Sequence, residues 1–404
     1  MAMNRRHFVK ASLGAGMLAL APQARAAASL SEGPSLGLDK VSRSPLKIAS
    51  VELLRSGAQH FVRSTTSDGA VGIAVTNDRV KYLHPILEQL VIPYFLGKDA
   101  RDLEALVDGV YVYKSNYKLA GLALWCCVGW VEFSLLDLLG KVAKKPVGAL
   151  LGRVLRREVP VYLSSMRRDT TPEQEVAWLG KRLAETGAKA VKLKIGGRMS
   201  KNADAAPKRT ERLVALARKT FGDAVTIYVD ANGSYDAAKA IEVGRVLEAH
   251  RVGFFEEPCP FEELEETKRV ADALTMPVAG GEQDASLPRF AWMVKNRVVD
   301  VVQPDVDYNG GFLRTARVAR LAAAARMPIT PHSPQTGPNV AYMLHFASCT
   351  PNVGKYLEYN AAPRRRETWY SPALEVSKGV VAVPDGPGLG ITIDAEVLRK
   401  AKRV

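Results

Sequence analysis

The chain has 404 residues, of which 47% are hydrophobic, so it can form two domains, or one large barrel with an accessory domain, around a sizeable core. Its formal net charge of +14 is compatible with nucleic acid, an anionic membrane or an anionic small molecule as a partner. The chain has no zinc finger, RNA-binding signature or basic helix with interleaved aromatic residues. We therefore expect no nucleic-acid partner and interpret the charge as a solvated basic surface that suits an anionic substrate. The four cysteines lack metal-ligand spacing and indicate no disulfide.

The N-terminus has the form of an export signal. Arg5 and Arg6 lie in a twin-arginine pattern, an apolar stretch follows as far as Leu20, and Ala24-Arg25-Ala26 has the small residues that signal peptidase prefers. The apolar stretch is too short for a stable transmembrane helix. We therefore predict a twin-arginine signal peptide over residues 1–26, export to the periplasm, and no membrane anchoring after cleavage. The alternative is an incidental arginine pair before an apolar segment.

A small α+β domain is predicted next. Residues 27–45 are rich in Ser and Gly and are interpreted as a linker. Over 46–158, three strand patterns precede three helical patterns, and an Asp-Gly turn at 68–69 between two of the strands is typical of a hairpin. The strands are expected at 46–54, 61–66 and 71–76, and the helices at 80–90, 100–110 and 120–142.

From residue 159 to 360, short apolar strands alternate with amphipathic helices. This alternation predicts an α/β fold with a parallel barrel, and a doubly wound open sheet is the second choice. No Gly-x-Gly-x-x-Gly follows the first strand, which disfavours a dinucleotide-binding sheet. The eight strands are expected at 160–164, 190–195, 225–230, 253–257, 277–282, 298–304, 328–332 and 355–359. Residues 361–404 break the alternation and are predicted to return to the first domain.

Three carboxylates lie at consecutive strand ends. Asp230, Glu256 and Glu282 follow one another at intervals of 26 residues, which is one strand-helix unit each time. Barrel enzymes place their active sites at these ends, and three clustered carboxylates repel one another unless a cation lies between them. A single acid at such a position is usually a solvated loop residue. All-oxygen ligands favour Mg²⁺, with Mn²⁺ as a substitute, over Zn²⁺. The neighbouring Glu257 is expected to point to the other side of its strand and to be structural.

Basic side chains are predicted at the same end of the barrel. Lys192 and Lys194 lie two apart on one strand, so both should face the barrel mouth, where burial and a like charge would lower a lysine pKa and provide a base. His332 ends the strand after the one that Asp305 ends, and this acid would orient its imidazole. Glu358 ends the last strand and could hydrogen-bond a developing oxyanion.

This ordered set resembles the mandelate racemase subgroup of the enolase superfamily. The resemblance rests on Lys-x-Lys, Asp, Glu-Glu-Pro, Gly-Glu, Pro-Asp with a following Gly-Gly, His and Glu, and it covers nearly the whole mature chain. It implies a (β/α)₇β barrel with an α+β capping domain built from both chain ends. The muconate-lactonizing branch is similar but places a Lys where this chain has Asp305, which argues against the reactions of that branch.

The resemblance also implies roles for the site residues. The three carboxylates would hold the metal, Lys194 would be one base, and the Asp305–His332 pair would be the other. Lys192 would steady the substrate carboxylate, and Asn232 would contact the substrate or the metal ligands.

Family members with this pair of bases mostly dehydrate acid sugars to 2-keto-3-deoxy acids, so we expect a dehydratase that removes the proton α to a carboxylate. The alternatives are a racemase or epimerase of a 2-hydroxy acid, and an exported binding protein for sugar acids without catalysis. We also expect a homo-oligomer.

Overall fold

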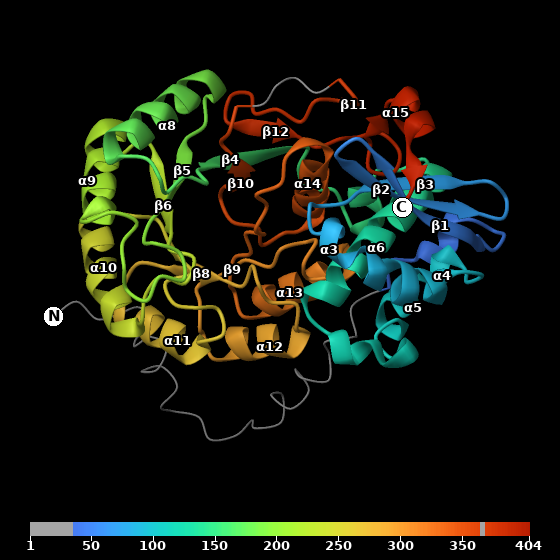
Figure 1. Cartoon of the computed structure of the whole chain (residues 1–404), viewed down its shortest axis with the longest axis horizontal. Helices are drawn as coiled ribbons and strands as arrows, with labels where there is room; N and C mark the ends of the chain where they lie inside the picture. The colour runs from blue at the N-terminus through green and yellow to red at the C-terminus, as the bar shows by residue number, and fades with distance from the viewer. Residues whose placement is uncertain (1–34, 364–367) are drawn as a thin grey trace.

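The computed structural model describes residues 35–363 and 368–404, so the predicted signal peptide and the first part of the predicted linker lie outside the described residues. The chain forms a curled parallel sheet surrounded by helices and a smaller domain beside it, which we call the cap (Figure 1). The α/β barrel prediction is confirmed, and the open-sheet alternative is wrong because β10 returns to pair with β4.

The parallel strands of the barrel run in the order β10-β4-β5-β6-β7-β8-β9. Helices α8 to α13 follow the outside of this sheet in chain order (Figure 1). The strands are β4 (Glu158–Ser164), β5 (Ala190–Lys194), β6 (Thr226–Asp230), β7 (Phe255–Glu256), β8 (Val278–Gly280), β9 (Val301–Val302) and β10 (Leu357–Asn360). The helices are α8 (Pro172–Thr186), α9 (Arg209–Phe221), α10 (Ala237–Ala249), α11 (Leu264–Ala273), α12 (Leu287–Lys295), α13 (Phe312–Ala324) and α14 (Val340–Cys349).

The strand predicted at 328–332 is reduced to isolated bridges. Ile329 pairs with Val302 and Val353, and His332 pairs with Asp305, but no continuous ladder forms. Pro328 and Pro331 fall within this segment, and proline has no N–H to donate to a ladder. The remaining amides still hold the segment in place, since Thr330 N donates to Val302 O at 2.9 Å and His332 N donates to Pro304 O at 3.2 Å.

An aromatic layer fills the barrel beneath the strand ends. Tyr228 and Phe254 stack with ring centroids 3.8 Å apart, and Tyr162 meets both rings edge-on. Tyr228 and Phe254 precede Asp230 and Glu256 by two residues, so each shares a face of its strand with a carboxylate. This layer therefore supports the site from below and excludes water from that side.

The cap combines both ends of the described chain. Strands β1 (Ile48–Ser56), β2 (Gln59–Thr66) and β3 (Val71–Val75) form an antiparallel sheet, and the C-terminal β14 (Lys402–Arg403) pairs with β1. The remaining elements of the cap are η1 (Leu38–Val41), α3 (Val80–Ile86), η2 (Leu87–Val91), α4 (Ile92–Phe95), η3 (Ala100–Asp102), α5 (Leu103–Gly109), η4 (Tyr113–Leu119), α6 (Leu122–Ala143), α7 (Val147–Leu151), β11 (Tyr370–Ser371), β13 (Thr392–Ile393) and α15 (Ala395–Lys400). Strand β12 (Val380–Ala382) instead pairs antiparallel with β4 of the barrel. Leu38 is buried, so the end of the predicted linker is a packed part of the cap.

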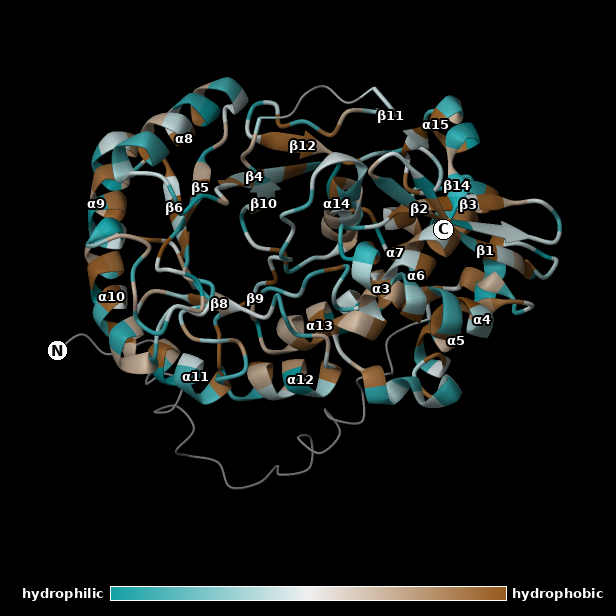
Figure 2. Ribbon diagram, in the orientation of Figure 1, coloured by the Kyte–Doolittle hydropathy of each residue, from teal (hydrophilic) through white to brown (hydrophobic). Residues whose placement is uncertain are grey.

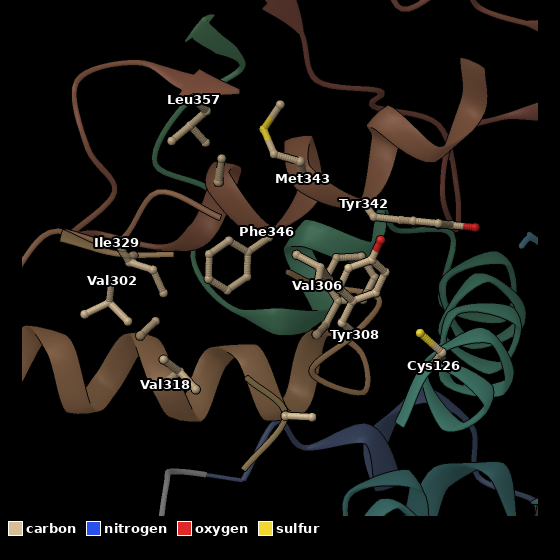
Figure 3. Close-up of a cluster of buried hydrophobic side chains, with 14 of the residues drawn as sticks. Cys126, Val302, Val306, Tyr308, Val318, Ile329, Tyr342, Met343, Phe346 and Leu357 are labelled. Carbon is tan, nitrogen blue, oxygen red and sulfur yellow. The ribbon is translucent and has the colours of Figure 1, made fainter. Parts of the chain in front are cut away.

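Helix α6 joins the cap to the barrel. It is long and apolar enough to cross a membrane by length and composition, but 89% of that window is buried within the protein, as is typical of a core helix. Its Phe133 stacks on Tyr342 of α14 with ring centroids 4.1 Å apart, and the Tyr342 hydroxyl donates to Val75 O at 2.8 Å. Figure 3 shows part of this buried cluster, to which α14 contributes Tyr342 and α6 contributes Cys126. Both domains therefore share one apolar core, and Figure 2 shows brown apolar positions on helices of both the barrel and the cap.

Candidate active site

The three carboxylates predicted from strand spacing meet at the barrel mouth. Asp230 ends β6, Glu256 ends β7, and Glu282 follows β8 by two residues. One carboxylate oxygen from each lies within 4.8 Å of the others, and all three side chains are buried. The parallel strands are in register, with Asp230 paired to Glu256, so the fold itself creates this cluster.

This donor set fits a divalent cation. Burial raises the pKa of Glu256, and the nearby Asp230, Glu358 and Glu282 add to the increase, while Lys192 opposes it. Glu282 Oε2 is buried and accepts no hydrogen bond of good geometry, although His332 Nε2 lies within ion-pair distance of it. The three grouped ligand atoms are all carboxylate oxygens, and an all-oxygen set favours Mg²⁺. We conclude that Asp230, Glu256 and Glu282 are suited to hold Mg²⁺, which would act as a Lewis acid towards a substrate carboxylate.

Both predicted lysines reach this cluster from β5. Lys192 Nζ lies 2.6 Å from Glu256 Oε1 and 2.8 Å from Glu358 Oε1, and its side chain is fully buried. Lys194 Nζ forms an ion pair with Asp230 and donates to Asn232 Oδ1 at 3.2 Å. Their shared face follows from the two-residue spacing on one strand.

The expectation that burial and a neighbouring like charge lower the lysine pKa is wrong for Lys192. Burial alone would lower the pKa of Lys192, but Glu256 and Glu358 outweigh it and raise the pKa well above the usual value. Lys192 therefore keeps its proton and acts as a fixed cation. A fixed positive charge suits the binding of a carboxylate.

His332 and Asp305 form the predicted pair. His332 Nδ1 lies 2.7 Å from Asp305 Oδ2, and His332 Nε2 lies 3.3 Å from Glu282 Oε2. Burial lowers the pKa of His332, but Glu282, Asp305 and Glu358 outweigh it and raise the pKa to about 10. A cation held by Glu282 would compete with the imidazole for that carboxylate and lower the His332 pKa. Asp305 Oδ1 also accepts from the amides of Asp307 and Tyr308, which fixes its orientation.

Glu358 lies at the mouth, but its contacts differ from those expected of a donor to an oxyanion. Burial raises its pKa, while Lys192, His332 and Lys194 outweigh burial and lower the pKa to about 2. Its Oε2 accepts from Ser333 N at 2.8 Å. An ionised carboxylate accepts hydrogen bonds but does not donate them. The ion pair with Lys192 therefore opposes the protonated form that a hydrogen-bond donor to an oxyanion needs, and the oxyanion role of Glu358 stays a prediction.

Several polar residues beside the triad were missed or misplaced from the sequence. Glu257 adopts a left-handed backbone with φ 42°, because β7 ends at Glu256, so strand alternation does not apply to it. Its Oε2 accepts from Asn232 Nδ2 at 3.1 Å, beside the site rather than away from it. Gln303 Nε2 donates to Glu256 Oε2 at 2.9 Å, and Arg168 donates to Asn232 Oδ1 at 2.8 Å. Gln303 could have been found as a lone polar residue near a strand end, whereas nothing in the sequence marks Arg168.

The site places an acid/base set around a carboxylate cluster, within an α/β barrel that carries a cap. This combination defines an enzyme of the class that activates carboxylate substrates with a divalent cation. The Enolase C-terminal domain-like family model matches residues 175–397. The chain belongs to the enolase superfamily and, within it, to the mandelate racemase group.

Individual relatives agree with this assignment. The chain is 30% identical over 383 residues to arabinonate dehydratase of Saccharolobus solfataricus, covering 92% of this chain and 95% of the relative. It is 31% identical over 317 residues to D-galactarolactone cycloisomerase of Agrobacterium fabrum, covering 76% and 81%. The crystal structure of a mandelate racemase/muconate lactonizing protein from Paracoccus denitrificans complexed with magnesium matches with a TM-score of 0.81 and 27% identity, covering 89% and 99%.

Proposed function

We propose that the chain is a magnesium-dependent dehydratase that converts an acid sugar to a 2-keto-3-deoxy acid. The observation that carries the proposal is the position of two proton-transfer groups, Lys194 and His332, at one carboxylate cluster. Lys194 contacts Asp230, and His332 contacts Glu282, so the two groups approach the cluster from different segments of the barrel wall. The dehydratase named among the relatives supports the same reaction class.

The chain's own residues account for each proton. The ammonium of Lys192 lies between Glu256 and Glu358 and would neutralise the substrate carboxylate. One of the two groups takes the α-proton, leaving an ene-diolate. His332, protonated and oriented by Asp305, then donates a proton to the β-hydroxyl, which leaves as water while the C–O bond breaks. The resulting enol becomes the 2-keto acid.

Racemisation or epimerisation of a 2-hydroxy acid is the second candidate. It needs the same two groups, since one removes the α-proton and the other returns a proton to the opposite face. A substrate without a β-hydroxyl cannot lose water, so racemisation or epimerisation is the expected reaction for it. A non-catalytic binding protein has no need for a paired acid/base set, so measured turnover separates it from both enzymes.

The proposal also covers where the enzyme is exported, which metal can replace Mg²⁺, and how the chain assembles. The arginine pair at Arg5 and Arg6 supports a twin-arginine signal peptide over 1–26 and a periplasmic location. We further propose that Mn²⁺ can substitute for Mg²⁺, that the mature enzyme has no membrane anchor, and that it is a homo-oligomer. Light scattering of the purified mature chain measures the assembly directly, and a monomeric mass contradicts that part.

The reaction is tested by incubating the Mg²⁺-loaded protein with a panel of mono- and diacid sugars and assaying 2-keto acid formation. We expect at least one member to form a 2-keto acid with loss of water. Inversion at the α-carbon without loss of water would support the racemase instead. The absence of both products across the panel would argue against the proposed function.

A further inference from the structure

One arginine of the cap reaches the barrel mouth. Arg79 immediately precedes α3 and follows β3 by four residues. Its backbone N–H donates to Asn77 Oδ1 at 3.0 Å, which fixes the start of the helix. Asn77 itself is buried, so the side chain of Arg79 projects from a well-anchored point rather than from a loose loop.

The Arg79 side chain lies over an aromatic residue of the catalytic end of the barrel. Its Cζ is 4.6 Å from the ring centroid of Tyr308. Tyr308 follows Asp305 by three residues, and its ring centroid is 6.1 Å from that of His332. Arg79 of the cap therefore contacts Tyr308, and Tyr308 lies beside His332, which is one of the two proton-transfer groups.

The charge of Arg79 has no carboxylate partner within ion-pair distance among residues 35–363 and 368–404, and the cation is placed instead on the Tyr308 ring. Arg79 is exposed to solvent, whereas Tyr308 is only 7% exposed. Contact with Tyr308 positions the guanidinium, and the N–H groups that do not face Tyr308 stay available for a planar anion. Asp305, whose charge acts on Arg79, is already engaged by His332 and by two backbone amides.

The site thus contains two separate cationic positions. Lys192 is fully buried beside the triad, and Arg79 stands at the mouth beyond His332. A substrate with one carboxylate needs the first cation only. We propose that Arg79 is a specificity-determining residue that binds the distal carboxylate of a dicarboxylic acid sugar, and this assignment rests on the proposed function. Arginine suits this task because its fork matches the two oxygens of a carboxylate.

The test compares a hexarate with the hexonate of the same configuration, which differ only in the terminal carboxylate. We expect the wild-type enzyme to have the higher kcat/KM for the hexarate. Arg79→Gln should lower kcat/KM for the hexarate about 10- to 100-fold, as is usual for a lost hydrogen bond between charged groups, and change that for the hexonate less than about threefold. Arg79→Lys should retain part of the preference. Lys81→Gln is the matched control, since Lys81 lies two residues further along, in the first turn of α3, with its charge paired to Asp78 at 3.3 Å.

A binding measurement keeps the two proposals distinguishable. Calorimetry of the Mg²⁺-loaded protein with the same two compounds should show tighter binding of the hexarate, and Arg79→Gln should remove the difference. If neither compound nor any other acid sugar is turned over, the proposed function is wrong, and the binding preference still decides the role of Arg79. If the wild type has the same kcat/KM and the same affinity for both compounds, the assignment is wrong. If Arg79→Gln lowers these values equally for both compounds, the assignment is also wrong and Arg79 has a structural role.

Discussion

Asp305→Asn should disable the enzyme through the tautomer of His332. In the wild type Asp305 Oδ2 lies 2.7 Å from His332 Nδ1, and Oδ1 accepts from two backbone amides at 2.8 and 3.0 Å. In the variant the amide oxygen can keep the backbone contacts, which turns the amide N–H₂ towards Nδ1. The imidazole proton then moves to Nε2, so Nε2 can no longer take the α-proton, and the imidazolium that donates to the β-hydroxyl loses the carboxylate that stabilises it. General acid–base groups contribute about 10²–10⁴-fold, so we expect kcat to fall by about that factor with a small change in KM.

The matched control is Asp307→Asn, two residues further along the same loop. Burial and the charge of Asp305 raise the pKa of Asp307 well above its usual value, which favours the neutral carboxyl that an amide resembles. The assay is steady-state formation of 2-keto acid on the best substrate of the panel, with circular dichroism to confirm folding. A folded Asp305→Asn enzyme with wild-type kcat, or an equal loss in both variants, would refute the reasoning.

Three further predictions concern the metal site, the export signal and the buried His345. Exhaustive EDTA treatment should abolish activity and Mg²⁺ or Mn²⁺ should restore it, and full activity of protein without detectable metal would contradict the triad as a metal site. A fusion of residues 1–35 to a folded reporter should reach the periplasm only while Arg5 and Arg6 are intact, and equal export after Arg5→Lys with Arg6→Lys would oppose the signal. Burial lowers the pKa of His345 from 6.5 to about 4, so the unfolded chain takes up the proton first and stability should fall by about 3 kcal/mol between pH 6.5 and 4. Urea unfolding should show that this component is absent from His345→Gln, and an unchanged pH dependence would contradict the burial argument.

Much of the site could be predicted because strand ends in a barrel converge. Asp230, Glu256 and Glu282 recur at the interval of one strand-helix unit, and that interval alone places them at one mouth. The pairing of Asp305 with His332 follows from the same argument, since their segments are neighbours. These predictions depend on chain topology, which hydrophobic alternation reveals, and not on the detail of any loop.

The remaining features depend on local geometry or on contacts distant in the chain. Strand alternation failed at Glu257 because its backbone is left-handed, and the ladder at 328–332 is interrupted by two prolines. The pKa of Lys192 is set by Glu256 and Glu358, which are far away in sequence, so the sign of its shift could not be found from its neighbours. Arg79 reaches Tyr308 across the boundary between cap and barrel, and no pattern within either segment indicates that contact.

The central claim is that Lys194 and His332 act on one α-carbon, and proton exchange with D₂O tests it most directly. We expect the wild-type enzyme to exchange the α-proton of its substrate with D₂O, or to remove that proton and expel water. Replacing the abstracting group, by Lys194→Ala or His332→Asn, should stop both α-proton exchange and product formation. Replacing the other group should stop product formation but leave exchange measurable, because the ene-diolate still forms and returns. Near wild-type turnover in both single variants would contradict the account even though the fold is established.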